Sequence, residues 1–138
     1  MKCDRLKIID KGSDTRSVWA DVAIGGVQLV VDQGVAERLL AQFPSLSQHA
    51  CKTGTFGDHL PGALLPHALE HLTIDLLVAR HPGETFAGNT CWLEREEHIM
   101  RVRISLPKRV SSHAVEAALS EALLQFNEIL SSPWRGTD

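Results

Sequence analysis

The feature that most constrains the fold is an apolar run over residues 63–80, which Pro82 and Gly83 terminate. Its aliphatic side chains gather on one face when the run is unrolled at about 100° per residue. An apolar run of this length with a strong stop signal behind it predicts one long helix with a buried face. The side chains expected on that face are Leu65, Ala68, Leu69, Leu72, Leu76 and Ala79.

The remaining segments predict a sheet and further helices that can cover this face. Strands are expected at residues 5–10, 17–24, 27–32, 85–93 and 99–106, and the other helices at 34–43 and 111–130. Gly25-Gly26 predicts a tight hairpin between the second and third strands. Strands and helices are grouped and do not alternate strictly. The sequence therefore predicts an α+β fold, with an antiparallel sheet and two long helices packed on one face.

Composition narrows the class of protein. A chain of 138 residues can bury a core without disulfides or metals, so we expect one domain at residues 1–130 and a tail at 131–138. A net charge of -3 gives no basic footprint, and we expect no nucleic-acid partner. No signal peptide and no run of membrane-spanning length is found, and the three cysteines are widely spaced. These features predict a cytoplasmic protein without a membrane contact.

Within the predicted helix, the segment from His67 to His71 has the pattern His-x-x-Glu-His. Residues four apart lie on one face of a helix, so both imidazoles can bind one ion while Glu70 handles the proton of a water molecule. The pattern is the reverse order of the zinc hydrolase motif His-Glu-x-x-His. Zinc is expected, although another divalent metal would also fit. The alternative is that the two histidines are helix residues without a metal role and Glu70 is a surface acid, because so short a pattern also occurs by chance.

The third protein ligand of such a zinc site is left open by the sequence. Glu116 borders the apolar stripe of the last helix and is the best placed carboxylate, whereas Glu121 projects further toward solvent. Cys51 and Cys91 are rival ligands, because a thiolate binds zinc equally well. His49, two residues before Cys51, could supply a ligand, a proton shuttle or a substrate contact.

The order of these features resembles the N-terminal domain of cyanophycin synthetases, which polymerise aspartate and arginine into a storage polypeptide. The matching features are Phe43-Pro44-Ser45-Leu46, His49-x-Cys51, a glycine-rich loop and the His67–His71 motif. The resemblance is strongest over residues 43–81. It implies a small α+β domain that binds the polymer and in some members clips it at a metallopeptidase-like site. It also implies His67 and His71 as metal ligands and Glu70 as the catalytic carboxylate.

More distantly, the segment from His67 to Leu72 looks like the metal helix of pitrilysin-type peptidases and of S-ribosylhomocysteine lyase. Those relatives differ in the third ligand, since one uses glutamate and the other uses cysteine. The chain departs from the synthetase pattern at residues 62–66 and 104–108. It also ends where the synthetase would begin its ATP-grasp and Mur-ligase-like domains, so no ATP-dependent ligation is expected.

These observations predict a metal-dependent hydrolase that cleaves peptide or isopeptide bonds, with a peptide or an Asp/Arg-type polymer as its partner. One alternative is a non-catalytic module of the same fold that binds a polymer or a protein. Another is a lyase or isomerase that uses the same metal helix on a small molecule.

Overall fold

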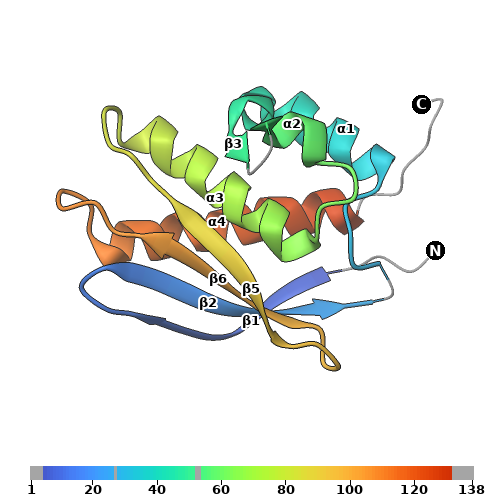
Figure 1. Ribbon diagram of the computed structural model, residues 1–138, viewed down its shortest axis with the longest axis horizontal. Coiled ribbons are helices and arrows are strands. Elements are labelled where there is room, and N and C mark those ends of the chain that lie inside the picture. The colour runs from blue at the N-terminus through green and yellow to red at the C-terminus, as the bar shows by residue number, and fades with distance from the viewer. Residues whose placement is uncertain (1–4, 27, 52–53, 132–138) are drawn as a thin grey trace.

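The computed structural model describes residues 5–131 except residues 27 and 52–53. A four-stranded antiparallel sheet has the order β1-β2-β6-β5, and helices cover one of its faces (Figure 1). The predicted α+β class is confirmed. The sheet strands are β1 (Arg5–Ser13), β2 (Ser17–Gly25), β5 (Gly88–Glu94) and β6 (Ile99–Ser105). The other elements are α1 (Gln33–Gln42), the 3-10 helix η1 (Pro44–Gln48), β3 (Ala50–Cys51), β4 (Gly54–Thr55), α2 (Phe56–His59), α3 (Leu65–Arg80) and α4 (Ser112–Ser131).

The hairpin predicted across Gly25-Gly26 is wrong. Strand β2 instead pairs with β1 on one side and β6 on the other, so neither of its edges is open to residues 27–32. The turn that starts β2 is set by Asp14, whose side chain accepts hydrogen bonds from the backbone N–H groups of Arg16 and Ser17. Residues 28–32, which were predicted as a strand, lie beside the start of α3 instead, where Val30 and Leu64 form an isolated bridge.

The two long helices α3 and α4 pack together over the sheet, as the sequence predicts (Figure 1). The apolar side chains predicted to face inward on α4 are all buried, namely Val115, Ala118, Leu119, Ala122, Phe126 and Ile129. On α3 the first three turns follow the prediction, but Ala79 is exposed and Leu77 is buried in its place. Helix α3 begins with Pro66 in its first turn, where no backbone N–H donor is needed, and ends at Arg80 before the Pro82-Gly83 stop.

The opposite face of the sheet carries polar and aromatic side chains. Asp21, Arg101 and Cys91 lie in register across β2, β6 and β5. Paired residues of an antiparallel sheet point to the same face, while neighbouring residues of one strand point to opposite faces. Thr90 contacts the helix layer, so Cys91 points away from it. No helix among the described residues is long and apolar enough to cross a membrane.

Candidate metal centre

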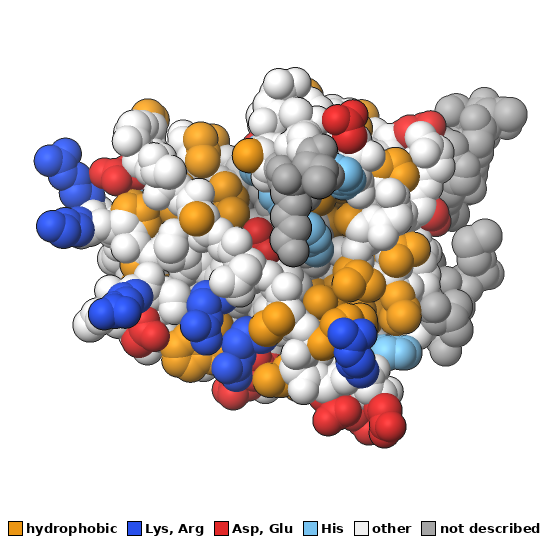
Figure 2. All heavy atoms as spheres, in the orientation of Figure 1, with side chains coloured by type: hydrophobic (Ala, Val, Ile, Leu, Met, Phe, Trp, Pro, Cys, Tyr) orange, Lys and Arg blue, Asp and Glu red, His pale blue; other side chains and the backbone are white. Residues whose placement is uncertain are grey.

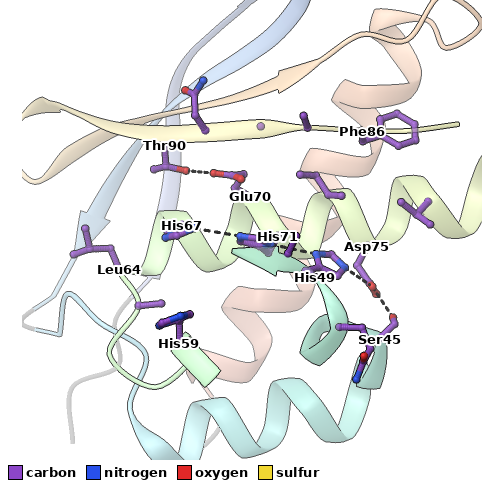
Figure 3. A pocket seen from close by; sticks show the side chains of 18 of the residues that line it. Ser45, His49, His59, Leu64, His67, Glu70, His71, Asp75, Phe86 and Thr90 are labelled. Atoms are coloured by element: carbon purple, nitrogen blue, oxygen red, sulfur yellow. Dashed lines mark hydrogen bonds and ion pairs between the residues drawn. The ribbon is translucent and has the colours of Figure 1, made fainter. Parts of the chain in front are cut away.

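A cleft of about 1500 Å³ lies along the outer flank of α3. One wall is the start of β5 with the residues before it, from Phe86 to Thr90, and the other wall is formed by η1 and the segments around α2. Figure 2 shows histidine side chains near the centre of this face, and Figure 3 shows His67, Glu70, His71 and His49 pointing toward the cleft. The motif of the sequence thus lies in a recess and not on an open helix face.

His67 and His71 present the same ring atom to each other. Their Nε2 atoms are 3.2 Å apart, because residues four apart on a helix are stacked one turn above the other. Two nitrogens bound to one tetrahedral zinc ion at 2.0–2.1 Å lie about 3.3 Å apart. The spacing of these two atoms therefore matches that of two nitrogens bound to one zinc ion.

Glu70 belongs to the same group. Each of His67, Glu70 and His71 offers one ligand atom, and these three atoms lie within 4.8 Å of one another, so the group could hold a metal ion. Glu70 is only 4% exposed, and its Oε1 accepts a hydrogen bond of 2.6 Å from Thr90. Burial raises the pKa of Glu70, while the Thr90 hydrogen bond and the charge of His49 partly oppose this. A buried carboxyl group with a raised pKa keeps its proton to a higher pH than an ordinary glutamate does, which favours a role in proton transfer.

His71 is held as a neutral ring. Burial, together with charge repulsion from the nearby His67 and His49, lowers its pKa to about 3. Phe56 of α2 stacks on the His71 ring, with a centroid distance of 3.9 Å and an interplanar angle of 14°. The neutral imidazole is the form that binds metal, and the stacked ring fixes the plane in which its lone pair points.

A second group of residues reaches His71 from the opposite side. Nδ1 of His49 lies 3.2 Å from Nδ1 of His71, and Nε2 of His49 lies 3.0 Å from Oδ1 of Asp75. The same Asp75 oxygen accepts a hydrogen bond of 2.5 Å from Ser45. Burial alone would raise the pKa of Asp75, but the hydrogen bonds from His49 and Ser45 outweigh it and lower the pKa below its usual value.

Asp75, Ser45, Thr90 and Phe56 were not predicted as site residues. For Asp75 a signal does exist in the sequence, because it follows His71 by four residues, as His71 follows His67. The other three belong to segments whose positions depend on the tertiary fold. His49 was predicted as a site residue with an open role, and it does lie at the centre.

Glu116 and Glu121 do not reach the group formed by His67, Glu70 and His71. Glu121 forms an ion pair with Arg80 at the end of α3, about 20 Å along the helix from His67. Helix α4 runs antiparallel to α3 (Figure 1), so Glu116 lies still further from the histidines. The prediction of Glu116 as third ligand is therefore wrong, because the way α4 is aligned against α3 keeps Glu116 away from the histidines.

The two cysteines considered as third ligands have different outcomes. Cys91 is exposed on the face of the sheet that points away from α3, so it cannot reach the histidines. The side chain of Cys51 lies outside the described part of the structure, although its backbone belongs to β3. Among the described residues, the third ligand atom near His67 and His71 is a carboxylate oxygen of Glu70.

Comparisons with models of known protein families, with curated proteins and with solved structures gave no match to this chain.

Proposed function

We propose that the protein is a zinc-dependent hydrolase that cleaves peptide or isopeptide bonds at the group of His67, Glu70 and His71. The observation that carries the proposal is the 3.2 Å spacing of the two histidine Nε2 atoms beside a buried carboxylate. Buried carboxylates are costly unless they are paired or used, and Glu70 faces an open cleft.

A zinc ion bound at this position would supply Lewis acidity and lower the pKa of a water molecule to about 7. Glu70 would take a proton from the attacking water molecule and deliver it to the leaving amine. Thr90 keeps the Glu70 side chain in place during both transfers, because its hydroxyl donates to Oε1. Glu70 would serve as general base and general acid in turn.

The shape of the cleft favours an extended chain over a small molecule. Its volume of about 1500 Å³ exceeds the range of about 300–1000 Å³ common for small-molecule pockets. Strand β5 is at the end of the sheet, with β6 as its one neighbour among the described strands. The free edge of a strand can pair with an extended peptide through backbone hydrogen bonds. The resemblance to the cyanophycin synthetase N-terminal domain adds an Asp/Arg-type polymer as the first substrate to test.

The test combines metal analysis with cleavage assays on peptides and on an Asp/Arg polymer. We expect about one zinc per chain in the wild-type protein and cleavage that is lost in Glu70→Gln. Retention of zinc in Glu70→Gln would make Glu70 the proton carrier, whereas loss of zinc would make it the third ligand. Glu96→Gln, in the exposed turn between β5 and β6, is the matched control. Absence of bound zinc, or unchanged cleavage by Glu70→Gln, would reject the proposal.

One observation favours the non-catalytic module instead. His71 lies 3.2 Å from both His67 and His49, which is within hydrogen-bonding distance. The three rings could therefore hydrogen-bond to one another without an ion. This alternative predicts that His67→Ala leaves the binding of a polymer or protein partner intact. It further predicts that no peptide in a library is cut.

Cys51→Ser in the same zinc assay tests the cysteine that the sequence suggested as a ligand.

A further inference from the structure

We infer that His49 and Asp75 are positioning residues that hold His71 with its Nε2 atom toward the metal position. The inference rests on the proposed function, because it concerns the same metal site. It assigns His49 a role distinct from those of ligand, proton shuttle and substrate contact. Neither residue would bind the ion.

The geometry is a continuous line of contacts from a carboxylate to the ligand atom. Oδ1 of Asp75 lies 3.0 Å from Nε2 of His49, and Nδ1 of His49 lies 3.2 Å from Nδ1 of His71. The opposite nitrogen of His71, Nε2, is the atom that faces His67. Figure 3 shows this line running along the cleft from Asp75 through His49 and His71 to His67.

Only one arrangement of protons satisfies this line when an ion binds Nε2 of His71. The single proton of that neutral ring is then on Nδ1, and it is donated to Nδ1 of His49. His49 must carry its own proton on Nε2, where the Asp75 carboxylate accepts it. Every ring nitrogen is used once, and the tautomer of His71 is fixed by a residue distant in sequence.

The backbone positions the two residues independently of any ion. Asp75 follows His71 by one helical turn on the same flank of α3. Ser45 of η1 donates a hydrogen bond of 2.5 Å to the Asp75 carboxylate. His49 ends η1, and its carbonyl oxygen accepts a hydrogen bond of 2.7 Å from the N–H of Phe56. Phe56 in turn stacks on the His71 ring. Two segments outside α3 therefore converge on one side of His71 and leave Nε2 on the other side.

His49 is poorly placed as a ligand of the same ion. It approaches His71 at Nδ1, whereas the spacing that fits zinc is between the Nε2 atoms of His67 and His71. Partners that orient a ligating histidine typically contribute 10–100-fold to metal affinity, whereas loss of a ligand removes much more. The size of the loss thus separates the two roles.

The experiment measures zinc affinity by competition with a chromophoric chelator in the full-length protein and its variants. We expect His49→Ala and Asp75→Ala to weaken zinc binding about 10–100-fold. His71→Ala is expected to abolish binding, and the exposed histidine variant His113→Ala is expected to match wild type. In the zinc-loaded wild type, nitrogen-detected NMR should show the proton of His71 on Nδ1 and that of His49 on Nε2. Circular dichroism confirms that each variant is folded.

Each outcome supports or rejects the inference. Unchanged affinity in folded His49→Ala and Asp75→Ala would overturn it while leaving the proposed function intact. Complete loss of zinc in His49→Ala would overturn it by making His49 a ligand. A His71 proton on Nε2 would place the ion on the wrong nitrogen and also overturn it. A wild-type protein that binds no zinc would reject the proposed function and this inference together.

Discussion

Thr90 on β5 donates a hydrogen bond of 2.6 Å to Oε1 of Glu70 on α3, so the end strand of the sheet holds the carboxylate of the motif helix. The two residues are twenty positions apart in the chain and belong to different layers of the fold. Any change in the packing of β5 on α3 therefore reaches the candidate site directly. This relationship gives the first two predictions.

Replacing Thr90 with valine should move the proton uptake of Glu70 to higher pH. The hydroxyl of Thr90 lowers the pKa of Glu70, and burial raises it, so loss of the hydroxyl leaves burial less opposed. Valine has the shape of threonine but no donor. If Glu70 acts as general base, the acidic limb of the cleavage rate against pH should shift upward. A profile identical to wild type would contradict this, and Glu96→Gln in the exposed turn after β5 serves as the control.

Gly88 is a close-packed position between β5 and α3. A Cβ atom there would lie 2.7 Å from the backbone oxygen of Arg103 and 3.2 Å from Cγ of Glu70. Because the backbone of β6 cannot easily yield, Gly88→Ala should displace β5 and the Glu70 side chain. We expect a loss of about 1–3 kcal/mol in the free energy of unfolding, together with weaker zinc binding. Urea denaturation and chelator competition measure the two effects.

The comparison for Gly88→Ala is Gly62→Ala, whose added Cβ would meet no atom within 4 Å. Gly62 has a φ of +91°, so its replacement strains the backbone without pressing on Glu70. Gly62→Ala should therefore lower stability but leave zinc affinity near that of wild type. Equal loss of zinc affinity in both variants would show that stability alone, and not the contact with Glu70, controls the site.

The sequence predicted the parts of the fold that depend on local periodicity. The apolar run that became α3 and the stripe of α4 were readable, because burial follows the helical repeat. The hairpin was mispredicted because Gly25-Gly26 is a local turn signal, whereas β2 is paired by β1 and β6 through the tertiary fold. Likewise, the pairing of α3 and α4 that removes Glu116 from the site has no local signal.

The candidate site shows the same division. His67, Glu70 and His71 come together because they share one helix, and their separations along the sequence predict this proximity. His49 was singled out, but its contact with Asp75 joins residues 26 positions apart across a loop and a helix. Helical periodicity places Asp75 on the flank of His67 and His71, but it does not show what Asp75 contacts. Its role becomes visible only when η1 is placed against α3.

Protonation of His71 should destabilise the metal-free protein in acid. The pKa of this histidine is about 3 in the folded state against 6.5 for an ordinary histidine, so the unfolded chain binds more protons between these values. The contribution of His71 to stability is therefore complete above about pH 6.5 and declines as the pH falls toward 3. With EDTA present, urea denaturation from pH 7.5 to 4 should show a shallower decline for His71→Gln than for wild type.

Glu70 should act in the opposite direction. Its raised pKa means that the folded state takes up a proton at higher pH than the unfolded chain, so this group favours folding as the pH falls. Glu70→Gln removes that effect and should make the acid-induced loss of stability steeper than in wild type. His113→Gln, at an exposed position of α4, should follow the wild-type curve. The same slope in all four proteins would contradict both assignments.

On the far face of the sheet, Asp21 and Arg101 should contribute to stability without affecting the metal site. Asp21 is 4% exposed, and both of its carboxylate oxygens accept hydrogen bonds from Arg101, at 2.7 and 3.0 Å. Arg101→Met leaves this buried carboxylate unpaired, which should cost about 1–3 kcal/mol of the free energy of unfolding. Adding Asp21→Asn to Arg101→Met removes the unpaired charge and should recover part of the loss. Zinc affinity should stay at the wild-type value in both variants, since the sheet separates this pair from α3. If the losses of stability from the two substitutions were strictly additive, the pairing of Asp21 with Arg101 would be contradicted.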